Sequence, residues 1–220
     1  MFDLDGTLSE SAPGIIGAMR LAFADLGISP LDDATERMLV GPPWATMLPP
    51  LIGDRLTEEV IAAYRRHYVD GELMYDTRLY PGVTDVLDAL RAAGVTMAVA
   101  TSKPEAYAVP IVERLGLAGY FTTVCGDGLH AERGTKALVI AEALRRLGEP
   151  SPAATIMVGD RRHDVEGAAV HGIDCLGVAW GYAAPDELEQ AGAVRVFDDA
   201  AALLAALPAL IDDAAPAAGP

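Results

Sequence analysis

Cysteine, aromatic residues and basic residues are all scarce in this sequence, and long apolar runs are absent. The 220 residues include 2 cysteines, 6% aromatic residues, and 16 Lys and Arg against 32 Asp and Glu. No apolar run reaches the roughly 20 residues that span a bilayer, and no charged start followed by an apolar stretch indicates a secretory signal. These absences argue against a disulfide-rich secreted protein and against a membrane-spanning one.

The formal net charge of −16 determines which partners are expected. Nucleic acids and anionic membranes would be repelled, so neither is an expected partner. Cys125 and Cys175 each lie in an apolar stretch, which predicts buried thiols in a reducing, cytoplasmic compartment. An anionic substrate would need a cation close to it in so acidic a chain. The sequence leaves open whether the protein forms a homodimer.

Short apolar runs alternate with stretches in which apolar residues recur at helical spacing. This alternation predicts an α/β fold with a doubly wound, mostly parallel sheet and helices on both faces. The expected strands are Val95–Thr101, Thr122–Cys125, Thr155–Val158, Cys175–Trp180 and a short Val194–Phe197. The expected helices are Val83–Ala93, Glu105–Leu115, Lys136–Leu147 and Ala200–Leu210.

Residues 13–77 depart from this alternation of strands and helices, because they contain no run that predicts a strand. An apolar stripe at helical spacing runs from Ile15 to Leu26 and ends at Gly27, and a second helical stretch follows Thr57. The segment therefore reads as a helical insertion. The predicted organisation is an α/β catalytic core of residues 1–12 and 78–213, a helical cap of residues 13–77, and a disordered Ala/Pro/Gly-rich tail of residues 214–220.

The segment Asp3-Leu4-Asp5-Gly6-Thr7 carries the strongest chemical signal. Two carboxylates two residues apart can converge on one site where a strand ends, and Gly6 permits the sharp turn that leaves both at that end. Ligands bind at the carboxyl ends of the strands in open α/β sheets. The simpler interpretation is a polar turn with solvated aspartates.

Thr101-Ser102-Lys103 directly follows the apolar run Val95–Ala100. A hydroxyl at this place, followed by the amides of a helix start, suits a phosphate oxygen, although it is also an ordinary helix cap. Lys136 lies at another expected helix start. Alone it is weak evidence, because most lysines there are solvated.

Gly159-Asp160-Arg161-Arg162-His163-Asp164 follows the run Thr155–Val158. Two aspartates four residues apart at the end of a buried strand can offer oxygen ligands to a hard cation. The alternative is an acidic turn in which Asp164 caps a helix.

These four groups together resemble the haloacid dehalogenase-like superfamily of phosphohydrolases. The four motifs of that superfamily match Asp3–Thr7, Thr101, Lys136 and Gly159–Asp164, and its helical cap is inserted where residues 13–77 lie. Three further segments are similar to its phosphoglycolate-phosphatase-like branch: Leu8–Pro13, Val40-Gly41-Pro42-Pro43 and Val178–Tyr182.

The resemblance implies a magnesium-dependent phosphatase that acts on a small phosphorylated metabolite through an aspartyl-phosphate. Asp3 would be the nucleophile, and Asp5 would protonate the leaving oxygen and later activate water. The implied Mg²⁺ ligands are Asp3, the backbone carbonyl of Asp5, Asp160 and, directly or through water, Asp164. The implied substrate-binding residues are Leu4, Gly6, Thr101, Ser102 and Lys136.

Single residues favour some members of the superfamily over others. Dehalogenating relatives lack an aspartate at the position of Asp5, so this residue favours phosphate chemistry, and Thr7 favours a hydrolase over a mutase. A 5′-nucleotidase, a pyrophosphatase, a protein-directed phosphotransferase and a catalytically silent protein of the same fold remain open. A signalling receiver domain fits poorly, since it is shorter and lacks a helical insertion.

Two expectations concern segments next to the core. Residues 13–77 are expected to act as a mobile lid that excludes water. Only Met1 and Phe2 precede Asp3, which is short for a central strand whose backbone groups need partners on both sides. We therefore expect the natural chain to begin several apolar residues upstream, and an extended chain to melt higher and bind Mg²⁺ more tightly.

Overall fold

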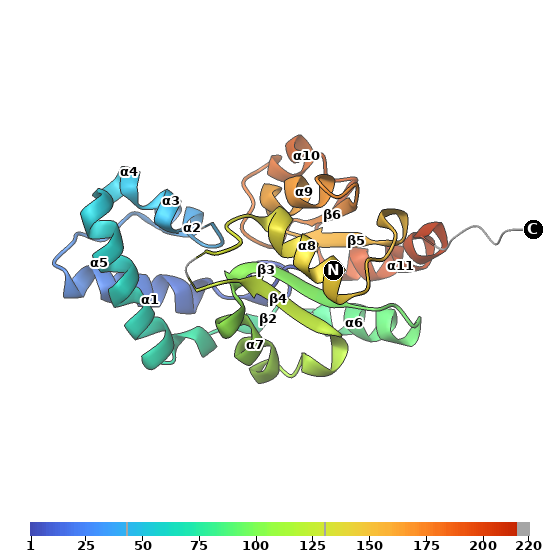
Figure 1. Cartoon of the computed structure of the whole chain (residues 1–220), viewed down its shortest axis with the longest axis horizontal. Helices are drawn as coiled ribbons and strands as arrows, with labels where there is room; N and C mark the ends of the chain where they lie inside the picture. Colours follow the sequence, from blue (N-terminus) through green and yellow to red (C-terminus); the bar gives the residue numbers. More distant parts are fainter. Residues whose placement is uncertain (43, 130, 215–220) are drawn as a thin grey trace, which may run out of the picture. The chain divides into compact units, whose positions relative to one another are not determined.

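The computed structural model describes residues 1–42, 44–129 and 131–214. Pro43 and residues 215–220 of the predicted tail lie outside the described residues. Ala214, expected in the tail, is the last residue of helix α11 (Ala200–Ala214). The chain divides into two compact units, one formed by Met1–Leu8 with Leu79–Pro220 and the other by Ser9–Arg78 (Figure 1).

The first unit is built on a sheet whose described pairs are all parallel. Phe2 joins its two halves through bridges to Val99 and Val158. This arrangement confirms the predicted doubly wound α/β fold, because parallel neighbours require helical crossovers. In spatial order the strands are β4 (Thr123–Asp127), β3 (Ala98–Pro104), the bridge residue Phe2, β5 (Ile156–Gly159), β6 (Asp174–Val178) and β7 (Arg195–Phe197).

Helices cover both faces of this sheet, since successive strand side chains point to opposite sides. On one face, Met1, Met157 and Cys175 belong to a buried cluster with residues of α8, α9 and α10. Their chain neighbours Phe2 and Val158 line a cavity between the sheet and the pair α6 and α11. The helices are α6 (Val83–Ala92), α7 (Glu105–Arg114), α8 (Lys136–Arg146), α9 (Arg162–Ala169), α10 (Glu187–Ala191) and α11 (Figure 1).

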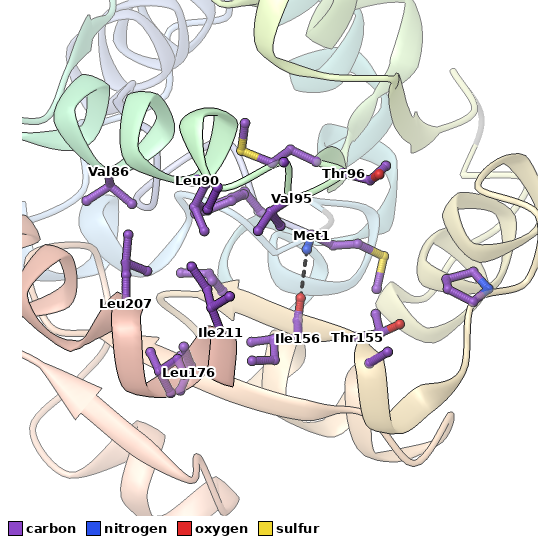
Figure 2. A pocket seen from close by; sticks show the side chains of 18 of the residues that line it. Met1, Val86, Leu90, Val95, Thr96, Thr155, Ile156, Leu176, Leu207 and Ile211 are labelled. Atoms are coloured by element: carbon purple, nitrogen blue, oxygen red, sulfur yellow. Dashed lines mark hydrogen bonds between the residues drawn. The ribbon is translucent and has the colours of Figure 1, made fainter. Parts of the chain in front are cut away.

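That cavity has a volume of about 650 Å³ and lies toward the amino ends of the strands (Figure 2). Val86 of α6, Leu207 of α11 and Met1 line it. The Met1 nitrogen donates a hydrogen bond to the Ile156 carbonyl oxygen at 2.7 Å. The carboxylates of the predicted site lie at the opposite, carboxyl ends of the strands.

Strand β3 begins and ends later than predicted. Val95 is not part of it, because the Val95 amide donates to the Leu90 carbonyl and closes the end of α6. At the other end, Thr101 lies inside the strand, and α7 begins only at Glu105. The helix predicted from Glu105 therefore begins where expected, but Thr101 is neither at the carboxyl end of the strand nor the cap of that helix, whose N-cap is Pro104. Likewise, Trp180 lies beyond the end of β6.

The second unit is helical. In α1, Met19 and Phe23 pack in one buried cluster with Val60 of α5, and the rings of Trp44 and Tyr64 are in tilted contact with their centroids 4.2 Å apart. Its helices are α1 (Ala12–Asp25), α2 (Asp33–Met38), α3 (Trp44–Met47), α4 (Pro49–Ile52) and α5 (Asp54–Arg65), followed by a π-helical turn, Arg66–Asp70, and a 3-10 turn, Leu73–Tyr75. Strands β1 (Ser9–Glu10) and β2 (Arg78–Leu79) pair where the chain enters and leaves this unit. The mobile lid stays a prediction.

Candidate active site

Asp3 stands at the carboxyl end of the central position of the sheet. Its amide donates to the Val158 carbonyl at 2.9 Å, and its Oδ1 accepts a hydrogen bond from the Leu4 amide at 2.8 Å. Gly6 turns the chain immediately afterwards with a φ of +86°, a conformation that costs glycine little. A side chain at Gly6 would overlap the Asp160 carboxylate, so this glycine also lets the two segments meet.

Three buried carboxylates converge at this edge. Asp3, Asp160 and Asp164 each place a carboxylate oxygen within 4.8 Å of the others. Asp160 is oriented by the Thr7 hydroxyl, which donates to Oδ1 at 3.0 Å, and by the Tyr182 amide, which donates to Oδ2 at 2.8 Å. Burial raises the pKa of Asp160 well above its usual value, and the charges of Asp164 and Asp3 add to this effect.

The two carboxylate oxygens of Asp164 have different tasks. Oδ2 accepts a hydrogen bond from the Arg161 amide at 3.0 Å and so helps to cap α9. Oδ1 lies 2.6 Å from the ammonium of Lys136. The helix-capping interpretation therefore holds for Oδ2, whereas Oδ1 pairs with Lys136.

Lys136 is the first residue of α8 and is buried, which contradicts the general expectation of a solvated lysine. A cation at a helix start opposes the helix dipole. Here two carboxylates compensate, because the ammonium lies 2.9 Å from Asp3 Oδ1 as well as near Asp164. Burial alone would lower the pKa of Lys136, but the charges of Asp164 and Asp3 raise it above its usual value.

Asp127, which the sequence reasoning missed, organises the loop that leads to Lys136. At the end of β4, its Oδ1 accepts hydrogen bonds from the amides of Gly128 at 2.7 Å, Arg133 at 2.8 Å and Gly134 at 3.3 Å. One carboxylate thus ties both sides of the loop together. The available signal was an aspartate shortly after the apolar run Thr122–Cys125.

Strand β3 is irregular where Thr101 and Ser102 lie. Ala100 pairs with Cys125, but the next paired residues are Pro104 and Asp127, so β3 contains two extra residues between these pairs. Such bulges re-aim side chains and are common next to active sites. Thr101 is buried and its Oγ1 accepts from the Lys103 amide at 3.3 Å, while Ser102 is half-buried.

The same bulge brings Lys103 to Asp5. The Lys103 ammonium lies 3.0 Å from Asp5 Oδ1 and 2.8 Å from Asp5 Oδ2, and both side chains are less than a tenth exposed. Asp5 is thereby held by a different lysine from the one that contacts Asp3. The sequence reasoning noted Lys103 only as part of a tripeptide, and no local pattern indicates its partner.

The residues present fit a hard divalent cation. Four carboxylates, those of Asp3, Asp5, Asp160 and Asp164, face two lysine ammoniums. Full ionisation would leave two negative charges, which one divalent cation balances. Carboxylate oxygens are also the donors that Mg²⁺ prefers. Asp3, Asp160 and Asp164 would therefore be its carboxylate ligands.

The raised pKa of Asp3 predicts a pH effect on the metal-free protein. Burial raises this pKa to about 6, against the Lys136 charge. The folded state then binds the proton more tightly than the unfolded chain, so the stabilisation is complete below about pH 4 and is lost as the pH rises through about 6. Relative to Asp3→Asn, the wild type should lose about 3 kcal/mol of unfolding free energy over this window.

Urea unfolding of both proteins in EDTA and in saturating Mg²⁺ measures this effect. Mg²⁺ should flatten the difference, because a bound cation stabilises the ionised carboxylate. The assignment fails if the two proteins keep a constant stability difference across the window in EDTA.

The comparisons with known proteins agree with this geometry. The family described as haloacid dehalogenase-like hydrolase matches residues 1–178. The tyrosine-protein kinase PtkA of Mycobacterium tuberculosis is 41% identical over 191 residues, covering 86% of this chain. This chain covers 65% of that relative, just under two thirds of its length.

In the part that the structure describes, no helix is long and apolar enough to cross a membrane.

Two further similarities cover nearly the whole chain. The phosphoglycolate phosphatase of Agrobacterium fabrum is 36% identical over 219 residues, which cover 94% of this chain and 91% of that one. The structure of a predicted phosphatase from Clostridium acetobutylicum superimposes with a TM-score of 0.86 at 32% identity, covering 94% and 96% of the two chains. The chain therefore belongs to the haloacid dehalogenase-like hydrolase family.

Proposed function

We propose that this chain is a magnesium-dependent phosphatase that hydrolyses a small phosphomonoester of the phosphoglycolate type through an aspartyl-phosphate on Asp3. The observation that carries the proposal is the buried group of Asp3, Asp160, Asp164 and Lys136, with Asp5 held apart by Lys103. The similarity to a phosphoglycolate phosphatase supports the substrate class.

In the first step, a carboxylate oxygen of Asp3 attacks the phosphorus atom. The bond from phosphorus to the leaving oxygen breaks, and Asp5 gives its proton to that oxygen. The Thr101 hydroxyl, the Lys136 ammonium and the amides around Leu4 would hold the phosphoryl oxygens. The alcohol leaves, and the phosphoryl group remains on Asp3.

In the second step, a water molecule attacks the phosphorus of the aspartyl-phosphate. Asp5, now ionised, takes a proton from this water, and the bond between phosphorus and Asp3 breaks. Inorganic phosphate leaves, and both aspartates return to their starting states. Asp5 therefore serves in both steps, which requires a defined position for its carboxylate.

The carboxylates of Asp3, Asp160 and Asp164, with the backbone carbonyl of Asp5, are the residues that would hold Mg²⁺. Bound there, the cation neutralises the charge of the phosphate and favours the ionised form of Asp3. This matters because burial raises the pKa of Asp3 to about 6.

Phosphotransfer directed at a protein is a second candidate. Its support is the 41% identity to a relative named tyrosine-protein kinase. The acyl phosphate on Asp3 would be the shared intermediate, and a tyrosine hydroxyl would take the place of water. Incubation with ATP or an acyl phosphate donor and a tyrosine-containing peptide, followed by mass spectrometry, tests this candidate.

Metal removal is the primary test of the proposed function. Phosphate release from p-nitrophenyl phosphate should fall at least about 100-fold in EDTA, because the buried carboxylates then repel the phosphate, and it should return with Mg²⁺. Circular dichroism in EDTA checks that the fold persists. Full activity in chelator would refute the metal assignment.

A substrate panel addresses the leaving group. We expect 2-phosphoglycolate to give the highest kcat/KM in a panel with nucleoside monophosphates, sugar phosphates, pyrophosphate and a tyrosine-phosphorylated peptide. A nucleotide or phosphopeptide at the top of the panel would overturn the substrate class and keep the reaction type. No hydrolysis of any member by the Mg²⁺-loaded protein would overturn the phosphatase itself.

A further inference from the structure

We infer that Lys103 is a positioning residue that holds the Asp5 carboxylate in place for both proton transfers. The inference rests on the proposed function and goes beyond it by assigning a role to a lysine outside the four motifs. Its basis is geometric. The ammonium contacts both oxygens of Asp5, at 3.0 and 2.8 Å, in a site where both side chains are buried.

The backbone around Lys103 is built to bring its side chain to Asp5. Lys103 lies in the bulge of β3, and its amide donates to the Thr101 hydroxyl. Gly126 on the neighbouring strand permits this path, because a Cβ there would come within 2.5 Å of both the Lys103 carbonyl and the Glu105 amide. Such a contact is too close for any other residue.

Asp5 needs such a partner because of where it stands. It precedes the Gly6 turn and lies two residues after Asp3. A cation bound by Asp3, Asp160 and Asp164 would therefore attract the Asp5 carboxylate. Lys136 contacts Asp3 and Asp164, so this lysine is engaged with the other carboxylates. A second, separate ammonium keeps the carboxylate of Asp5 apart from those groups and directed to the leaving oxygen and the attacking water.

Substrates with different leaving groups distinguish a loss of Asp5 positioning from a general loss of activity. An alkyl phosphate needs the proton of Asp5 to leave, whereas p-nitrophenolate leaves without it. Lys103→Met should therefore lower kcat on 2-phosphoglycolate by about 10- to 100-fold more than it lowers the rate of phosphoenzyme formation from p-nitrophenyl phosphate. With p-nitrophenyl phosphate a burst of p-nitrophenol should appear, because the second step still uses Asp5. KM should change little.

Three variants complete the test. Lys103→Arg should recover part of the activity, since a guanidinium also pairs with both oxygens of a carboxylate. Lys103→Met combined with Asp5→Asn should be no slower than Asp5→Asn alone, because Lys103 acts through Asp5. Arg146→Met is the structural control. Arg146 pairs with Glu105, just after the bulge, so its loss weakens the same region and should leave the leaving-group preference unchanged.

Several results would overturn the inference. A raised KM with an unchanged leaving-group preference, and effects that multiply with Asp5→Asn, would make Lys103 a substrate-binding residue. Crystal structures of wild type and Lys103→Met provide a readout independent of activity. The Asp5 carboxylate should leave its position in the variant, and an unmoved carboxylate would refute the assignment. Inactive wild-type protein would overturn the proposed function alone, and the displacement of Asp5 would still decide the role of Lys103.

Discussion

Asp3→Asn is expected to remove turnover and phosphoenzyme formation together. An amide is a poor nucleophile, so kcat should fall by about 10³- to 10⁶-fold, as when other enzymes lose a nucleophile. Phosphate release measures turnover, and intact-protein mass spectrometry after rapid acid quench measures the phosphoenzyme. Asp5→Asn should also slow turnover strongly, but it should retain phosphoenzyme formed from p-nitrophenyl phosphate. The double variant should be little worse than Asp3→Asn, because residues that act as a unit are not additive.

Stability distinguishes this loss of chemistry from unfolding. Burial raises the pKa of Asp3, so the ionised side chain destabilises the metal-free folded state near neutral pH. The neutral amide keeps the size of the carboxylate, and its oxygen can still accept the Leu4 hydrogen bond. Asp3→Asn should therefore unfold at the same or a higher urea concentration than the wild type in EDTA. Near-normal turnover by a stable Asp3→Asn protein would exclude the covalent mechanism.

Lys136→Met is expected to lower both activity and stability. The lysine is the shared partner of two buried carboxylates. Breaking a buried ion pair from one side costs about 3–5 kcal/mol, because the remaining charges lose their partner. The loss should be larger at about pH 8 than at about pH 5, since protonation can neutralise the abandoned carboxylates at the lower pH. Activity should fall about 10²- to 10³-fold through the lost contact with the phosphoryl group.

Arg145→Met is the matched control for this substitution. Arg145 lies on the same helix and pairs with Glu142, but its side chain is 66% exposed. Exposed ion pairs contribute about 0–1 kcal/mol, so this variant should unfold almost as the wild type does. If Lys136→Met also lost less than about 1 kcal/mol in EDTA, the carboxylates would not depend on the lysine and the described charge balance would be wrong.

Much of the fold and part of the site could be predicted from local patterns. Apolar runs alternating with helical spacing identified the α/β class, and the rule that ligands bind at strand carboxyl ends placed Asp3 and Asp160 at one edge of the sheet. Lys136 was added to that site only through the resemblance to a known family. The prediction worked because parallel strands place all their carboxyl ends together. The helices α2, α3 and α4 escaped it, since elements of four to six residues are too short to show a period.

The partners within the site were decided by tertiary structure. Thr7 was noted in the sequence as a family marker, yet its hydroxyl orients Asp160, far along the chain. The later start of β3 has a local cause, because the Val95 amide follows Gly94 in its left-handed conformation and donates to the Leu90 carbonyl at the end of α6. Asp127 organises the loop before Lys136 through backbone amides, whose direction depends on the fold of that loop.

The sequence by itself determined which chemical groups stand at the ends of strands, because strand ends and turns are encoded by neighbouring residues. Only the tertiary structure decided that Lys136 serves Asp3 and Asp164 while Lys103 serves Asp5. The two lysines are chemically identical, but Lys103 lies within β3 and Lys136 begins α8. Their partners differ because a bulge in β3, opposite Gly126, and the start of α8 direct them to different carboxylates. Such directions depend on strand register and helix placement across distant segments, which no local pattern records.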